Sequence, residues 1–139
     1  MDITDYSSSN LGEVGFICSK RFEMKENLIA VKTFDFALDI VNFVIDFQYE
    51  KKEFVLSKQL LRAGTSIGAN VAESEFAQSR SDFNHKMSIS LKEANETRFW
   101  LRLFKHSKLN AECDDQLKNV DEIIKILVSI VNTSKSKMK

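Results

Sequence analysis

The chain of 139 residues contains no proline and only four glycines. Both residue types interrupt helices, so their scarcity favours long helices that are joined by short turns. No apolar run approaches the roughly 20 residues that a membrane-spanning helix needs. The first residues, Met1 to Asp5, have neither the basic region nor the apolar run of a signal peptide. We therefore expect a cytoplasmic protein without a membrane partner.

Cysteine and histidine are also rare, with two of each. Cys18 and Cys113 form neither a CxxC pair nor a metal-ligand spacing, and we interpret them as reduced thiols without a chemical role. His85 and His106 are too far apart to bind one metal ion from a single helix. A di-metal site in a helical bundle uses Glu-x-x-His motifs, which are absent. The sequence therefore predicts no metal, no cofactor and no enzymatic activity.

Apolar residues recur at helical spacing in four segments, and no segment alternates as a strand does. The expected helices span residues 27–50, 54–76, 80–106 and 110–131. We interpret residues 1–26 as a flexible or loosely docked arm, and residues 133–139 as a basic, frayed tail. Short connections between four helices predict an all-α fold, an up-down-up-down four-helix bundle over residues 27–132.

Two helix starts carry capping signals. Ser79 precedes Asp82 by three residues, which resembles a capping box with Asp in place of the usual Glu. Asn110 is a candidate N-cap for the last helix. In the arm, Phe16, Ile17 and Phe22 are candidate anchors onto the bundle.

The first helix has two apolar stripes, whereas one is enough for a bundle core. One stripe consists of Phe34, Ala37, Leu38, Val41, Val44, Ile45 and Gln48, and the other of Phe36, Ile40, Phe43 and Phe47. The third helix likewise has a second face, formed by Ile89, Glu93, Glu96, Trp100 and Leu103. A surplus apolar stripe is a candidate subunit interface, so we expect a homo-oligomer.

The second helix contains Gly64 and Gly68, four residues apart, and Ala72 continues this row. An interior glycine costs a helix roughly 1 kcal/mol relative to alanine, so a row of them suggests a structural reason. We predict that the glycines mark the closest contact between two helices.

A polar row lies beside the glycines and consists of Arg62, Ser66, Asn70 and Glu73. If the second and third helices form an antiparallel hairpin, the numbers of facing residues add to about 157. Arg62 then lies between Glu93 and Glu96, and Gly68 faces the third helix near Ile89. We predict a partly buried polar network of Arg62, Glu93 and Glu96, joined by the rest of the row.

The net charge is zero, with 20 basic and 20 acidic residues, so only the charge distribution is informative. The last helix is rich in acidic residues. Four cations cluster toward one end of the second and third helices: Lys58, Arg98, Arg102 and Lys105. This cluster is either an ordinary solvated face or a phosphate-binding patch that oligomeric symmetry repeats. In the second case we expect the acidic helix to lie away from the bound strand.

The blocks that carry a family resemblance are residues 59–73, 82–83, 91–97 and 100–101. Together they resemble the four-helix-bundle proteins that are encoded in intervening sequences of bacterial 23S rRNA genes, over residues 28–132. The resemblance implies a barrel-shaped homopentamer. This family is similar to accessory proteins of diversity-generating retroelements, which bind nucleic acid and a reverse transcriptase through a basic surface.

Two functional hypotheses remain open. In the first, the protein is a non-enzymatic, oligomeric accessory factor that binds rRNA, another structured RNA or DNA through Lys58, Arg98, Arg102 and Lys105. In the second, it is a protein-interaction scaffold without a nucleic-acid role. A reverse transcriptase or another protein is a candidate partner.

Overall fold

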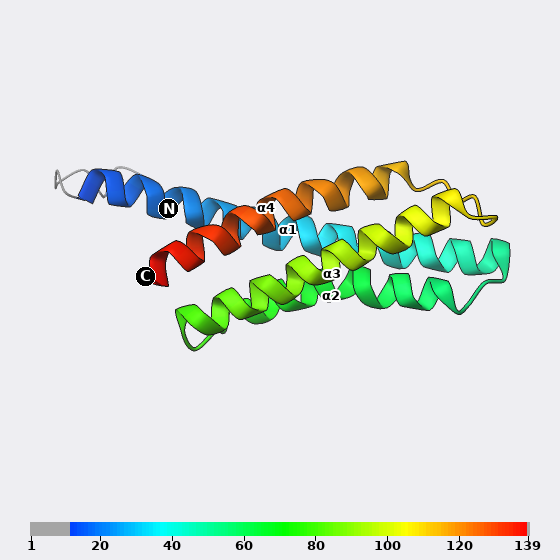
Figure 1. Cartoon of the computed structure of the whole chain (residues 1–139), viewed down its shortest axis with the longest axis horizontal. Coiled ribbons are helices and arrows are strands. Elements are labelled where there is room, and N and C mark those ends of the chain that lie inside the picture. Colours follow the sequence, from blue (N-terminus) through cyan, green and yellow to red (C-terminus); the bar gives the residue numbers. More distant parts are fainter. Residues whose placement is uncertain (1–11, 139) are drawn as a thin grey trace.

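The computed structural model describes the backbone of residues 12–138 and the side chains of residues 20–138. It has four helices: α1 (Gly12–Lys51), α2 (Leu56–Ser74), α3 (Arg80–His106) and α4 (Asp114–Met138). Residues 12–138 contain no strand, so the predicted all-α class with four helices is confirmed. Successive helices run in opposite directions, and α1 and α3 each pack against both α2 and α4 (Figure 1).

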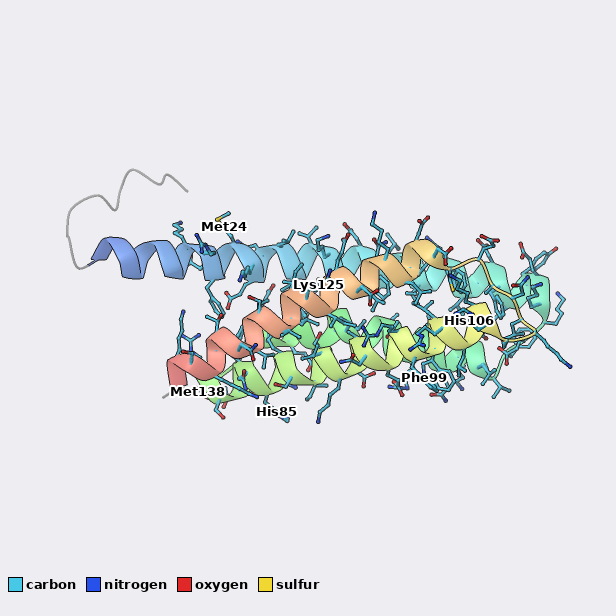
Figure 2. The ribbon with its side chains drawn as sticks, turned by 45° about the horizontal axis from the view of Figure 1, so that its top comes forward. Met24, His85, Phe99, His106, Lys125 and Met138 are labelled. Carbon is cyan, nitrogen blue, oxygen red and sulfur yellow. The ribbon has the colours of Figure 1, made fainter. Side chains whose placement is uncertain are left out.

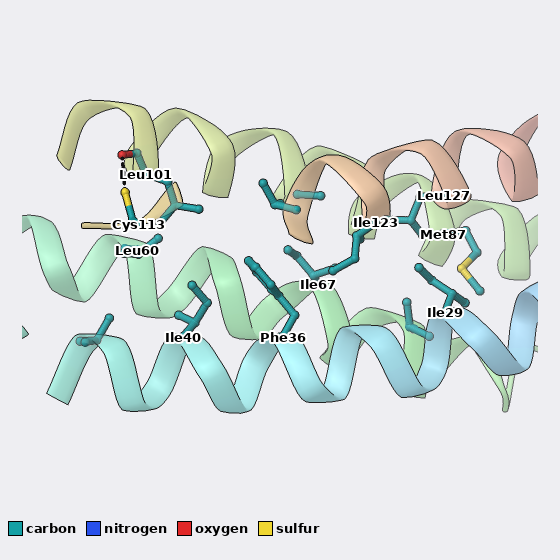
Figure 3. Packing of buried hydrophobic residues seen from close by; sticks show 14 of the residues in the cluster. Ile29, Phe36, Ile40, Leu60, Ile67, Met87, Leu101, Cys113, Ile123 and Leu127 are labelled. Atoms are coloured by element: carbon teal, nitrogen blue, oxygen red, sulfur yellow. Dashed lines mark hydrogen bonds between the residues drawn. The ribbon is translucent and has the colours of Figure 1, made fainter. Parts of the chain in front are cut away.

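All four helices contribute to one apolar core (Figure 3). Its fully buried large side chains include Ile29, Ile40, Leu60, Ile67, Met87, Leu101, Phe104, Ile123 and Leu127. Burying one such side chain stabilises the fold by about 1.5–3 kcal/mol relative to leaving it exposed. Of the two stripes predicted on α1, the one that contains Phe36 and Ile40 enters this core, and so does Val44, which the sequence had placed in the other stripe.

The helix α1 begins at Gly12, so the arm predicted over residues 1–26 is wrong for residues 12–26. Residues 1–11 lie outside the described part. The polar composition of this segment does not stop the helix, because it contains no proline. Phe22 anchors this segment to the bundle. Its side chain is buried, and its ring centroid lies 6.0 Å from that of Phe83 and 4.3 Å from Lys137 Nζ.

The bounds of α4 also differ from the prediction at both ends. The helix continues to Met138 with Ser134 fully buried, so the frayed tail predicted over residues 133–139 is wrong for residues 133–138. The helix begins at Asp114, and Asn110 instead has a φ of 46° in the turn before it, so Asn110 is not the N-cap. Asparagine tolerates this left-handed conformation better than most residues.

The turn before α4 is fixed by Cys113, which is buried. Its Sγ donates a hydrogen bond to the backbone oxygen of Leu101 at 3.3 Å, drawn as a dashed line in Figure 3. Burial raises the pKa of the Cys113 thiol, and the nearby Asp114 carboxylate adds to this. The thiol is therefore a packing group, as the sequence predicted for a cysteine without partners.

The turn between α2 and α3 confirms the predicted cap. The Ser79 hydroxyl accepts a hydrogen bond from the Asp82 backbone N–H at 3.0 Å, and α3 begins at the next residue, Arg80. The Asp82 carboxylate reaches back, as in a capping box, but accepts from the N–H of Gln78 at 3.2 Å.

Glu53 caps the start of α2, although its sequence context carried no usual capping signal. Its carboxylate accepts hydrogen bonds from the backbone N–H groups of Val55 at 2.9 Å, Leu56 at 2.7 Å and Ser57 at 2.9 Å. Desolvation raises the pKa of Glu53, but these hydrogen bonds together outweigh it, so the pKa lies below its ordinary value. Three otherwise unpaired donors are thus satisfied by one side chain.

We predict that Glu53→Gln lowers the free energy of unfolding by about 0.5–2 kcal/mol at pH 7, the usual range for a lost cap. Because the pKa of Glu53 is lowered in the folded state, its stabilisation is complete above the unfolded pKa and is lost as the pH falls through the folded value. The deficit of the variant should therefore shrink below about pH 4. Urea unfolding at both pH values measures it, with Glu50→Gln as the control. An equal deficit at pH 7 and pH 3 would contradict this role.

The two interior glycines of α2 lie against α1. A methyl group placed on Gly68 would lie 3.0 Å from the backbone oxygen of Thr33, and one placed on Gly64 would lie 2.9 Å from Ile40 Cγ2. The predicted close approach of another helix is present, but its partner is α1 and not α3. The hairpin register alone could not show this, because it describes only α2 and α3.

We predict that Gly68→Leu lowers the free energy of unfolding by about 1–3 kcal/mol, because the new side chain overpacks the backbone of α1. The control is Ala69→Leu, on the exposed neighbouring position. Thermal and urea unfolding compare the two variants with the parent. A Gly68→Leu protein as stable as the Ala69→Leu protein would show that the close approach has no energetic importance.

Candidate interaction surfaces

The ionic contact predicted between α2 and α3 is present. Arg62 Nη1 lies 3.3 Å from the Glu93 carboxylate, and Nη2 donates a hydrogen bond to Glu96. The register of α2 against α3 is the expected one. The Ser90 hydroxyl donates a hydrogen bond to the backbone oxygen of Ile67 at 2.9 Å, and these two residue numbers add to the predicted sum of about 157. An antiparallel hairpin therefore brings these charges together.

The predicted partial burial holds for Glu93 but not for Arg62, which lies at the surface. The side chain of Arg62 is 47% exposed and that of Glu96 is 38% exposed, whereas that of Glu93 is 22% exposed. Burial raises the pKa of Glu93, and the neighbouring Glu96 carboxylate adds to the rise, against the lowering effect of Arg62. The water around Arg62 and Glu96 weakens their attraction.

The other members of the predicted polar row do not join the network. Ser66 Oγ donates to the backbone oxygen of Arg62 at 2.6 Å, and Asn70 Nδ2 donates to that of Ser66 at 2.8 Å. Such bonds to the preceding turn compete with contacts across helices. Glu73 instead pairs with Lys86, at 2.8 Å. Ser66 and Asn70 of the polar row thus bond along α2, and its two charged residues form separate ion pairs with α3.

We predict that Arg62→Ala lowers the free energy of unfolding by no more than about 1 kcal/mol, as is usual for exposed ion pairs. The effect should decrease further in high salt, because exposed charges are screened. A double-mutant cycle with Glu96→Ala isolates the pair. A loss above about 3 kcal/mol would instead indicate a pair that behaves as buried.

The predicted basic patch is half neutralised by α4. Arg98 Nη1 lies 3.2 Å from the Asp121 carboxylate, and Lys105 Nζ lies 2.6 Å from that of Asp114. The expectation that the acidic helix lies away from this patch is therefore wrong. Among residues 20–138, Lys58 and Arg102 have no ion pair.

An exposed apolar row follows the outer side of α1. We call it the α1 seam; its members and exposed fractions are Val31 61%, Phe34 67%, Leu38 53%, Ile45 59% and Tyr49 77%. The spacing in steps of three, four and seven is that of a helix that packs against another helix. Three of these residues, Phe34, Leu38 and Ile45, belong to one of the two stripes predicted on α1; the sequence predicted a surplus stripe but did not show that it is this one.

The α1 seam adjoins a shallow cleft between α1 and α2, with a volume of about 340 Å³. Small side chains dominate its lining, which is Ala30, Phe34, Ala37, Thr65, Gly68, Ala69, Val71, Ala72 and Glu75. Ala72, the third member of the glycine row, is exposed and lines this cleft. Apolar surface of this extent usually marks an interaction site.

A second exposed apolar surface lies where α2 begins and α3 ends. We call it the α2–α3 patch; its members are Phe54 56%, Val55 75%, Phe99 55% and Leu103 41% exposed. The Phe99 ring packs edge-on against Trp100, with centroids 5.3 Å apart. In the antiparallel register, Leu103 falls opposite the start of α2, near Phe54. Of this patch, the sequence predicted only Leu103, because Phe54 and Val55 lie in a turn without periodicity.

Two classes of site are absent from the part of the chain that the structure describes. There, no three side chains of His, Cys, Asp or Glu are grouped so that they could hold a metal ion. None of the described helices is both long and apolar enough to cross a membrane.

These features define a four-helix-bundle protein with two exposed apolar surfaces. The family model described as 23S rRNA-intervening sequence protein matches residues 25–129, and the chain belongs to this family. The chain is also similar to a crystal structure from Bacteroides thetaiotaomicron VPI-5482, described as a protein with unknown function from the S23 ribosomal protein family. The TM-score is 0.75 and the identity 46%, over 78% of this chain and 98% of that one. No curated protein matches the sequence.

Proposed function

We propose that the protein is a non-enzymatic, homo-oligomeric bundle that acts as a protein-interaction scaffold. The α1 seam is the observation that carries this proposal. Five large apolar side chains in one row, each more than half exposed, are costly for a monomer in water. A second copy that covers this row removes that cost.

The energies are of the required size. Burying a large apolar side chain stabilises by about 1.5–3 kcal/mol, whereas association costs an estimated 4–15 kcal/mol. The five side chains of the α1 seam, together with the adjoining cleft, offer enough apolar surface to offset that cost. We propose five copies in a closed barrel, a number that rests on the family resemblance.

The nucleic-acid hypothesis has less support from the side chains. A cation that contacts a phosphate displaces a counterion from the nucleic acid, but Arg98 and Lys105 already pair with carboxylates of α4 and would first have to leave them. Only Lys58 and Arg102 of the predicted cluster remain for such contacts. RNA, DNA or a reverse transcriptase is therefore the second candidate partner, after another copy of this chain.

We predict that Leu38→Glu converts the oligomer to a monomer at micromolar concentration, because it places a charge in the middle of the α1 seam. Leu38 is 53% exposed, so the variant should fold as the parent does. Light scattering should give about five chain masses for the parent and one for the variant. The matched control is Lys125→Glu, which adds an acidic residue on the exposed side of α4 and should leave the mass unchanged.

A parent protein of monomeric mass would overturn the scaffold proposal. An anisotropy titration of structured RNA at about 50 and 200 mM salt tests the nucleic-acid hypothesis against the scaffold proposal, because phosphate contacts lose most of their affinity over this range. The scaffold proposal expects no binding at the lower salt. Binding that Arg102→Glu abolishes would favour the nucleic-acid hypothesis.

A further inference from the structure

The two exposed apolar surfaces face different sides of the bundle. Met24 lies seven residues before Val31 and therefore on the same line of α1, and it is 67% exposed. In Figure 2, Met24 projects from the upper edge of the molecule, whereas Phe99 of the α2–α3 patch lies at the lower edge. A copy that covers the α1 seam therefore leaves the α2–α3 patch of the same chain uncovered.

The unpaired charges beside the middle of the α1 seam are acidic, whereas at its end Lys52 Nζ lies 4.7 Å from the centroid of the Tyr49 ring. Asp35 and Asp46 are exposed beside the seam, and neither has an ion pair within residues 20–138. Asp39 lies on the same side of α1 and accepts a hydrogen bond from Gln116 at 3.0 Å. The nearby Lys32 does not offset this charge, because it already pairs with Glu122 at 3.2 Å.

At the border of the α2–α3 patch, the carboxylates of Glu53 and Glu96 are already occupied by backbone N–H groups and by Arg62, and the unpaired charges are basic. Lys58 and Arg102 are exposed there, and both lack a carboxylate partner in the described part of the chain. Lys58 lies four residues after Phe54 on the sequence, and Arg102 is adjacent to Leu103. The two apolar surfaces thus carry borders of opposite sign.

We propose that the α1 seam of one copy docks onto the α2–α3 patch of the next copy, in a head-to-tail contact. This inference rests on the proposed function, for which it names the second surface. Apolar burial provides the affinity, and the opposite borders select the pairing. Lys58 and Arg102, which the sequence placed in a candidate phosphate-binding patch, are then part of a contact between subunits.

A symmetric contact between two α1 seams is the alternative geometry, and the charges disfavour it. Two antiparallel copies of α1 would bring their acidic borders to the same side of the contact, where like charges repel. The α2–α3 patch would also remain exposed to water. A head-to-tail contact covers both surfaces, and it closes into a ring when the rotation between copies permits.

The decisive experiment mixes two variants, each defective on one surface. Leu38→Glu damages the α1 seam and Leu103→Glu damages the α2–α3 patch. Each variant alone should be monomeric. An equimolar mixture should form a dimer of one copy of each, because the intact seam of the Leu103→Glu chain meets the intact patch of the Leu38→Glu chain. Native mass spectrometry with a mass tag on one variant identifies the species.

The remaining outcomes separate the inference from the proposed function. If Leu103→Glu assembles as the parent does, or if two monomeric variants do not pair, the head-to-tail contact is wrong and the scaffold proposal stands. If Leu38→Glu stays oligomeric, the proposed function itself fails. Circular dichroism checks that both variants fold, and Phe99→Glu repeats the test at a second position of the patch. Lys125→Glu, mixed with either variant, is the control for added charge.

Discussion

The close approach of α2 to α1 at the two glycines constrains the rest of the structure. The backbone oxygen of Thr33 lies 3.0 Å from the place that a Cβ on Gly68 would take, so a larger residue at this position would push the two helices apart. This contact turns Ile40 and its row of α1 inward. Because different apolar stripes on one helix face different directions, Phe34, Leu38 and Ile45 of the other stripe are then left outside, whereas its Val44 is buried.

The placement of α4 decides the electrostatics of the opposite side. Its acidic residues lie along α3, where Asp121 forms an ion pair with Arg98 and Asp114 forms one with Lys105. A neutral chain thus has small charged borders instead of one basic face. Charges of this kind guide association between proteins more than they stabilise a fold. The proposed scaffold agrees with this pattern, since opposite borders accompany the two apolar surfaces.

Some short-range signals in the sequence were informative, although the predicted Asn110 cap was wrong and the Glu53 cap was missed. The Ser79 and Asp82 cap depends on neighbouring residues, and the Arg62 contact depends on a hairpin register that the rise per residue fixes. The same reasoning failed at residues 12–26, where polar composition was taken for an arm. Nothing in that segment stops a helix, and Phe22 finds aromatic and cationic partners from α3 and α4, which no local pattern reveals.

The sequence by itself determined the helical class, the start of α3, the surplus stripe on α1 and the family to which the chain belongs. Each follows from periodicity, a local cap or a matching block of residues, none of which needs a three-dimensional neighbour. Only the tertiary structure decided that the glycines meet α1, that Arg62 remains exposed, and that α4 neutralises half of the basic cluster. These outcomes depend on how helices distant in sequence are rotated about their axes, and that rotation is set by packing across the whole core.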